Sequence, residues 1–213
     1  MKKSILELNK EAWNNIGESV FSPYIKQPKF KEMFEEFCSK LPERAKVLDI
    51  GCGSGIPITK ALADKGFRIT GTDISEKMVA AAKKNIPGGD FECTSMTDME
   101  YEEEFDGEIS VYSMLLLDPQ NFKKAATRIV ASLKKGGHFL LTLNEPGPEG
   151  HKEEENYTEI MGQQMYSRPY TEQEIRNVFC PLGMEIIKVK RETVKTENYG
   201  TEHCLMILMR KES

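Results

Sequence analysis

The sequence predicts an α/β protein built on a doubly wound, mostly parallel β-sheet with helices on both faces. Between residues 46 and 143, short apolar runs alternate with longer segments of helical periodicity, which is typical of repeated βα units. Apolar strands of this kind are buried on both faces of a parallel sheet. Two more apolar runs lie close together near the C-terminus, so we expect the sheet to end in an antiparallel hairpin.

Residues 4–41 predict helices ahead of the sheet. In the later helix, apolar residues recur at spacings of three and four and form one stripe. This stripe consists of Phe30, Met33, Phe34, Phe37, Cys38 and Leu41. Pro28 lies near the start of that helix, where a missing N–H costs little.

The alternating block predicts five strands and three helices. The strands are expected over Lys46–Ile50, Arg68–Thr72, Asp90–Cys93, Glu108–Tyr112 and His138–Leu143. The helices are expected over Pro57–Lys65, Ser75–Asn85 and Asn121–Leu133. Ser75 is expected to cap its helix, and Gly136-Gly137 to turn the chain into the last strand of the block.

The final third has a different composition. Residues 144–170 are rich in proline, glycine and charge, and form an insert after the fifth strand. A helix over Thr171–Phe179 follows, and then two strands over Met184–Thr193 and Glu202–Arg210 with a polar turn between them. We find no repeat and no interdomain linker, so residues 1–213 are expected to form a single domain.

The composition limits the possible partners and compartment. The formal net charge of −5 does not favour a nucleic-acid partner. No apolar run approaches the ~20 residues that span a bilayer, and the first ten residues do not resemble a leader peptide. The five cysteines are scattered without a C-x-x-C pair, which favours buried, reduced thiols. We therefore expect a cytoplasmic protein without a metal site, as a monomer or homodimer.

Three glycines at alternate positions follow the first strand of the block, in the segment Val47–Ile56. Glycine lets the backbone approach a ligand closely and tolerates positive φ. The helix that follows points free N–H groups and a positive dipole end at the same place. Asp73 ends the second strand, where a carboxylate can accept the hydroxyls of a ribose. The two segments together predict a nucleotide-type site.

Four segments in this order resemble the class I S-adenosylmethionine-dependent methyltransferases, in particular the methyltransferase type 11/25-like group. They are Val47–Gly55, Gly71–Ser75, Phe105–Leu117 and Leu133–Phe139. The resemblance covers residues 45–145 and implies a Rossmann-like fold that binds S-adenosyl-L-methionine. It further implies transfer of a methyl group to a small-molecule acceptor by in-line displacement. In this scheme residues 1–44 form a helical lid, 45–145 the cofactor-binding core, and 146–213 a substrate-side insert and hairpin.

The resemblance also implies cofactor-binding residues. Gly51 and Gly53 would admit the methionine part of the cofactor, Asp49 would position the loop and the ammonium group, and Asp73 would hold the ribose. The full set is Asp49, Gly51, Cys52, Gly53, Asp73, Ile74, Ser95, Met96, Val111 and Tyr112. Ile74 would pack on the adenine ring, and Ser95 and Met96 would contact the edge of that ring. Val111 and Tyr112 would line the methionine part and the donated methyl group.

Aromatic, cationic and imidazole side chains of the lid, the fourth strand and the insert are candidates for the acceptor pocket. They are Trp13, Tyr24, Tyr112, His151, Tyr166 and Arg168. His138 and His203 fall within predicted strands, where we expect packed or surface histidines. Related proteins often carry histidines after the fourth strand, where this chain has Leu115–Leu117, so we expect an apolar wall and assign no catalytic residue. Methyl transfer needs alignment more than a dedicated base, because the cofactor carries its own leaving group.

Four other functions are compatible with parts of the pattern. A nicotinamide-dependent oxidoreductase would use a similar glycine loop, although the spacing here is G-x-G-x-G. A metal-assisted methyltransferase could draw on Asp118, Asn144 and Glu145. A catalytically silent module that binds S-adenosylmethionine or a partner, or a methyltransferase acting on RNA or protein, would share the core motifs.

Overall fold

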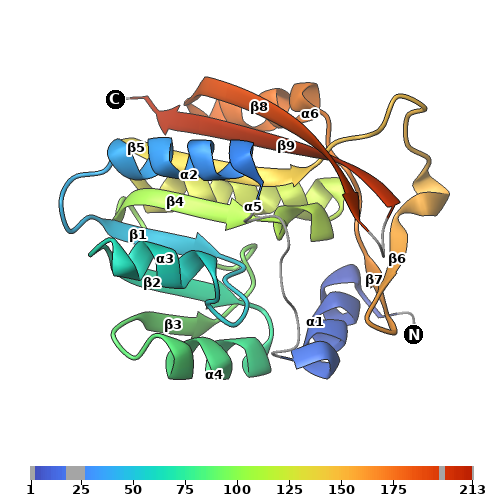
Figure 1. Cartoon of the computed structure of the whole chain (residues 1–213), viewed down its shortest axis with the longest axis horizontal. Coiled ribbons are helices and arrows are strands. Elements are labelled where there is room, and N and C mark those ends of the chain that lie inside the picture. The colour runs from blue at the N-terminus through green and yellow to red at the C-terminus, as the bar shows by residue number, and fades with distance from the viewer. Residues whose placement is uncertain (1–2, 18–26, 197–199, 213) are drawn as a thin grey trace.

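The computed structural model describes residues 3–17, 27–196 and 200–212. A seven-stranded sheet in the order β3-β2-β1-β4-β5-β9-β8 forms its centre (Figure 1). The strands are β1 Lys46–Ile50, β2 Arg68–Asp73, β3 Asp90–Cys93, β4 Phe105–Val111, β5 Leu133–Asn144, β8 Met184–Thr196 and β9 Gly200–Lys211. The pairs from β3 to β5 are parallel, whereas β9 pairs antiparallel with both β5 and β8. The predicted fold class is confirmed, including the antiparallel C-terminal strands.

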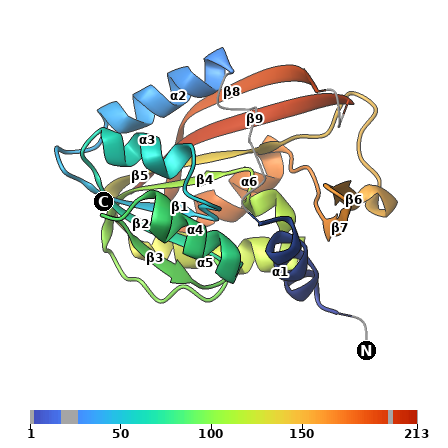
Figure 2. The same cartoon turned by 60° about the horizontal axis from the view of Figure 1, so that its bottom comes forward.

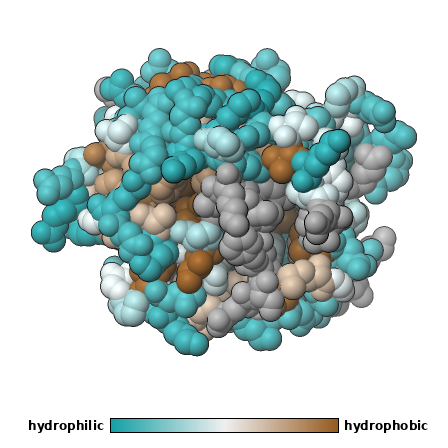
Figure 3. Space-filling model, viewed as in Figure 1, coloured by the Kyte–Doolittle hydropathy of each residue, from teal (hydrophilic) through white to brown (hydrophobic). Residues whose placement is uncertain are grey.

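Helices cover both faces of this sheet. The α-helices of the described residues are α1 Ile5–Ile16, α2 Pro28–Ser39, α3 Ile58–Asp64, α4 Glu76–Asn85, α5 Pro119–Ser132 and α6 Glu172–Phe179. The apolar stripe of α2 packs with α3 on one face, while α5 and α6 pack on the other. Figure 2 shows α2 and α3 on the opposite side of the sheet from α5. The outer surface over α2 is mostly hydrophilic (Figure 3), as a one-sided stripe requires.

The helix ends follow local capping chemistry. Ser75 caps α4 as predicted, because its side chain accepts a hydrogen bond from the Met78 N–H. Ser4 and Glu7 form a capping box at the start of α1. None of the helices in the described ranges has the length and apolar character needed to cross a membrane.

The predicted helical N-terminal region divides between two places. The α2 helix packs on the sheet, whereas α1 lies beside the carboxyl edge of the parallel strands (Figures 1 and 2). Asn9 of α1 bonds to the backbone of Leu116 and Tyr166. Lys10 and Asn14 contact Glu76 at the start of α4. These contacts hold α1 between the insert on one side and the start of α4 on the other.

The insert contains structure that the sequence did not predict. Residues 157–166 form a hairpin of β6 Tyr157–Ile160 and β7 Gln163–Tyr166. Met161 and Gly162 both have positive φ, at 50° and 76°, which is typical of a two-residue type I′ turn. The hairpin was missed because methionine is an unusual residue in that turn.

Strand β5 begins earlier than predicted and contains an irregularity. Leu133 pairs with Phe105, and pairing then resumes between His138 and Gly107, so β5 carries extra residues between these points. Gly136 has φ +74° there, a conformation that glycine adopts without strain. The glycine pair therefore lies within the strand rather than ahead of it.

The cysteines are all free, and two of them differ from the prediction. Cys38 and Cys204 are buried and Cys52 is partly buried, but Cys93 and Cys180 are exposed. The expectation of buried thiols is therefore wrong for Cys93 and Cys180, which occupy a strand end and a short 3₁₀ turn at the surface.

Glu108 in β4 is completely buried, and this gives stability a pH dependence. Burial raises the pKa of Glu108 to about 8, although Ser132 donates a hydrogen bond to the carboxyl group. The unfolded carboxyl loses its proton near pH 4. Between these pH values the folded state therefore holds one more proton than the unfolded state, and stability falls as pH rises.

We expect Glu108→Gln to flatten this dependence, because the amide has the same shape and stays neutral. The difference in slope between wild type and variant should approach at most about 1.4 kcal/mol per pH unit between pH 5 and 8. Urea unfolding measured across this range tests it, with the exposed Glu185→Gln as control. Parallel profiles for wild type and Glu108→Gln would contradict the assignment.

Candidate functional site

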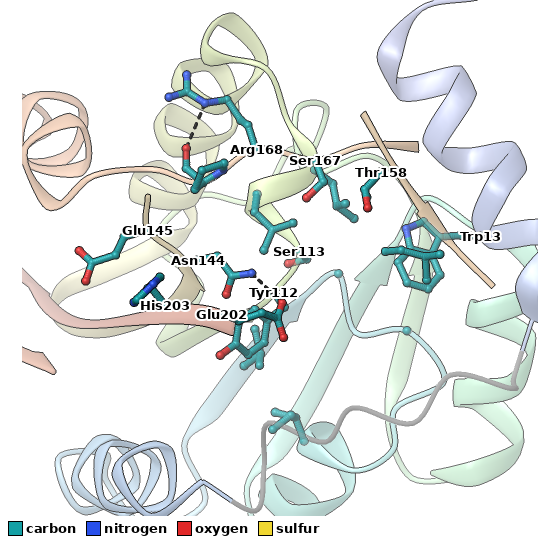
Figure 4. Close-up of a pocket in the computed structure, with 18 of the residues that line it drawn as sticks. Trp13, Tyr112, Ser113, Asn144, Glu145, Thr158, Ser167, Arg168, Glu202 and His203 are labelled. Carbon is teal, nitrogen blue, oxygen red and sulfur yellow. Dashed lines mark hydrogen bonds between the residues drawn. The ribbon is translucent and has the colours of Figure 1, made fainter. Parts of the chain in front are cut away.

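A cavity of about 850 Å³ opens at the carboxyl edge of the parallel strands. Its walls come from the loops after β1, β4 and β5, from α1, and from the start of β9 (Figure 4). A smaller cavity behind Trp13 shares Gly51, Asp73 and Ser113 with it. The strand order reverses between β1 and β4, and open α/β sheets bind ligands at this position.

The glycine loop after β1 folds tightly onto the neighbouring strands. The N–H groups of Gly51 and Cys52 both donate to the Thr72 carbonyl, at 2.8 and 2.9 Å. Gly51 has φ +74°, and a Cβ atom there would lie 2.4 Å from the Cβ of Ser113. At Gly53, with φ +55°, an added Cβ would meet no atom within 4 Å. The loop is thus packed on its inner side and open at Gly53, which lines the cavity.

Asp73 joins the end of β2 to this loop. The Gly53 N–H donates to one carboxylate oxygen and the Ser75 N–H to the other, both at 2.9 Å. Burial raises the pKa of Asp73, and the backbone donors oppose that shift. A carboxylate oxygen accepts more than one hydrogen bond, so both oxygens can still accept from a ligand.

Asp49 lies at the base of the cavity and is only 2% exposed. The Thr59 hydroxyl donates to it at 2.6 Å. Burial raises the pKa of Asp49 to about 7, and the nearby charge of Asp73 adds to the shift. A ligand cation beside Asp49 would favour its ionised form.

The tip of β4 has a strained backbone. Tyr112 has φ +52°, and its N–H donates to the Thr142 carbonyl at 2.8 Å. Such a conformation costs a non-glycine residue about 1–3 kcal/mol and is common at functional sites. It turns Ser113 back toward β1, where its hydroxyl donates to the Ile50 carbonyl at 2.7 Å. Leu115 and Leu116 follow in the cavity wall, as the predicted apolar wall requires.

All ten predicted cofactor-binding residues line one of the two cavities. Those in the larger one are Asp49, Gly51, Cys52, Gly53, Asp73, Val111 and Tyr112. Those in the smaller one that do not also line the larger are Ile74, Ser95 and Met96. The individual roles of these residues remain predictions.

The candidates for the acceptor pocket are only partly brought together. Trp13, Tyr112, His151 and Arg168 line the larger cavity. Tyr166 does not: it is 4% exposed, and its ring packs edge-on against that of Tyr157 at 5.6 Å. Tyr24 lies outside the described residues.

Arg168 reaches the cavity wall but engages its guanidinium elsewhere. One terminal nitrogen contacts Glu174 at 2.7 Å, and the group lies 4.2 Å from the centre of the Tyr170 ring. The Nε atom donates to the Pro169 carbonyl (Figure 4). His151 Nε2 lies 2.6 Å from the side-chain oxygen of Asn156. The contacts of Arg168 with Glu174, Tyr170 and Pro169 thus hold its guanidinium within the local structure and not toward a ligand in the cavity.

The structure adds polar residues that sequence reasoning did not assign to the acceptor pocket. His203, expected as a packed or surface histidine, lines the cavity together with Glu202 and Asn144. Asn144 ends β5, and Glu202 and His203 lie near the start of β9. Because β9 is antiparallel to β5, it begins at the edge where β5 ends. The antiparallel pairing of β9 with β5 is the signal that would have placed Glu202 and His203 at the cavity.

The three residues considered for a metal-assisted mechanism have different positions: one caps a helix, and two line the cavity. Asp118 caps α5, accepting from the N–H groups of Gln120 and Asn121. Asn144 and Glu145 line the cavity. Within the described ranges, no cluster of three or more histidine, cysteine, aspartate and glutamate side chains has the arrangement of a metal site.

Comparison with known proteins identifies the central segment. Residues 47–137 match the family model of the methyltransferase domain. A ubiquinone biosynthesis O-methyltransferase of Pseudomonas aeruginosa is 36% identical over 107 residues, which are 46% of this chain and 44% of that protein. The chain spans about half the length of the curated relatives it matches.

Two solved structures share the fold over the whole chain. One is the 1,6-didemethyltoxoflavin-N1-methyltransferase of Burkholderia thailandensis, with bound 1,6-didemethyltoxoflavin and S-adenosylhomocysteine. The TM-score is 0.77 and the sequence identity 19%, and the match covers 100% of this chain and 92% of the chain in that structure. The other is the cyclase SpnF, with a TM-score of 0.72 at 15% identity, covering 100% and 97% of the two chains. At these identities the likeness establishes the fold alone.

Proposed function

We propose that this chain is a class I S-adenosylmethionine-dependent methyltransferase that transfers a methyl group from S-adenosylmethionine to a small-molecule acceptor, and the match of residues 47–137 to the methyltransferase domain supports this proposal. The observation that carries the proposal is the Asp73 carboxylate, held by the N–H groups of Gly53 and Ser75 at the cavity wall. It fixes the glycine loop and keeps acceptor capacity for two neighbouring hydroxyls.

The residues of the cavity fit this cofactor. Asp73 would hold the ribose, while the open side of Gly53 leaves room for the methionine part. The buried carboxyl of Asp49 would face the ammonium group, which would lower the pKa that burial has raised. Ile74 and Met96 line the smaller cavity, where their apolar surfaces would contact the adenine ring. When bound, S-adenosylmethionine supplies an activated methyl group together with its leaving group.

The chain itself would align the two reactants and exclude water. Alignment of nucleophile, methyl and sulfur supplies several kcal/mol of barrier reduction in well-oriented reactions. Tyr112 and Leu116 line the cavity next to the glycine loop, and Trp13 of α1 forms another part of the cavity wall. We propose that α1 serves as the lid, since it contacts both the insert and α4.

A small molecule is the acceptor class that the cavity favours. Its volume of about 850 Å³ lies near the upper end of the ~300–1,000 Å³ typical of small-molecule sites, which suits a cofactor and a second ligand. Relatives that match the central segment include O-methyltransferases of ubiquinone biosynthesis. The net charge of −5 does not favour RNA.

The reaction needs its own test, because one of the fold neighbours is named a cyclase and a fold does not determine a reaction. We expect the protein to move label from methyl-labelled S-adenosylmethionine into a low-molecular-weight compound of a metabolite extract. The Asp73→Ala variant at equal concentration is the control and should give much less product. Cofactor binding without any labelled product would instead support the silent binding module.

A further inference from the structure

We infer that the methyl acceptor is an uncharged or cationic molecule with N–H or O–H donors, and that Asn144 and Glu202 bind those donors. The inference rests on the function proposed above and names the substrate class of the same cavity. Both residues line the cavity, next to Tyr112 (Figure 4).

Their geometry leaves one acceptor without a partner. Asn144 Nδ2 donates to Glu202 Oε1 at 3.0 Å. A carboxylate only accepts hydrogen bonds, so this contact fixes the orientation of the amide. The amide oxygen of Asn144 then points away from Glu202; it is buried, and no hydrogen-bond donor reaches it from the part of the chain that the structure describes. A buried carbonyl without a donor is costly, and a ligand N–H or O–H would satisfy it.

The strand pairing holds this pair in place. Asn144 stands opposite Cys204, so Glu202 lies two residues along β9 on the same face of the sheet. Both side chains therefore project from adjacent backbone-paired strands, which is a more rigid support than the insert loop provides.

The charges around the cavity disfavour an anion. Five acidic side chains line it: Asp49, Asp73, Glu145, Glu149 and Glu202. Glu145 is paired with Arg191, and burial raises the pKa of Asp49 to about 7, so Asp73, Glu149 and Glu202 supply most of the negative charge. Among the described lining residues, Arg168 is the one permanent cation, and its guanidinium is paired with Glu174. The field inside the cavity therefore repels a carboxylate or phosphate ligand and attracts a cation.

Three probes of nearly equal shape separate charge from donor capacity. Benzamidine is a cation with N–H donors, benzamide is a neutral donor, and benzoate is an anion without donors. Each is titrated by NMR into protein saturated with S-adenosylhomocysteine. We expect benzamidine to bind most tightly, benzamide next and benzoate weakest.

Two variants locate the interaction. Asn144→Leu removes the carbonyl acceptor, and Glu202→Gln removes the negative charge while keeping the shape of the side chain. We expect each to weaken benzamidine binding about tenfold or more. The control is Glu185→Gln, an exposed residue near the far end of the β8–β9 pair, which should bind all probes as wild type does. Unchanged affinity for S-adenosylhomocysteine in every variant shows that the fold is intact.

The outcomes separate the two claims. Benzoate binding as tightly as benzamidine, no probe binding, or unchanged benzamidine affinity in both variants would overturn the inference about the acceptor alone. Failure of wild type to bind S-adenosylhomocysteine would overturn the proposed function, and the inference with it.

Discussion

Asp73→Ala is expected to bind S-adenosylhomocysteine more weakly than wild type by about 1–3 kcal/mol, or roughly 5–150-fold. The substitution removes the acceptors proposed for the ribose hydroxyls. It also leaves the N–H groups of Gly53 and Ser75 without their present partner, so the loop loses its connection to β2. Isothermal titration calorimetry measures the difference.

A matched control is Asp64→Ala on the exposed surface of α3. Asp64 pairs with Lys60, and exposed pairs of this kind contribute little. The affinity of the Asp64→Ala variant for S-adenosylhomocysteine should equal that of wild type. If Asp73→Ala also kept the wild-type affinity, the ribose would have to be held elsewhere.

Gly51→Ala should destabilise the fold by roughly 2–5 kcal/mol, the sum of a left-handed backbone for alanine and a steric clash. The added Cβ would lie 2.4 Å from the Cβ of Ser113. Ser113 has little freedom to move away, since its hydroxyl is bonded to the Ile50 carbonyl and to Ser110. Cofactor binding should fall as well, because the same shift displaces the loop.

Gly66→Ala isolates the backbone contribution. Gly66 has φ +87° and no atom within 4 Å of an added Cβ, so only the left-handed conformation is penalised, at about 1–2 kcal/mol. Urea unfolding of both variants tests the difference. Equal losses of stability would contradict the close packing of the glycine loop on β4.

The cofactor half of the site could be predicted from sequence because its residues are local to strand ends. Asp49 and Gly51 lie at the end of β1, and Asp73 at the end of β2, so the βα pattern alone brings them to one edge. Ser75 was identifiable as a cap by the same local chemistry. Each of these predictions needed only a neighbouring strand and the helix after it.

The acceptor half depends on pairings that no local pattern contains. The last strand, β9, lies between β5 and β8, and this order brings Glu202 next to Asn144. Tyr166 was misjudged for a related reason, because alternation along β7 turns its ring to Tyr157 rather than into the cavity. Spacing alone does not say which face of a short hairpin is buried.

The most direct test of the central claim is calorimetric titration of the wild-type protein with S-adenosylmethionine, S-adenosylhomocysteine and NADH under the same conditions. The glycine loop, the Asp73 carboxylate and the buried Asp49 together predict that the first two ligands bind and that NADH does not. Binding of NADH in the absence of binding by either S-adenosyl compound would contradict the account.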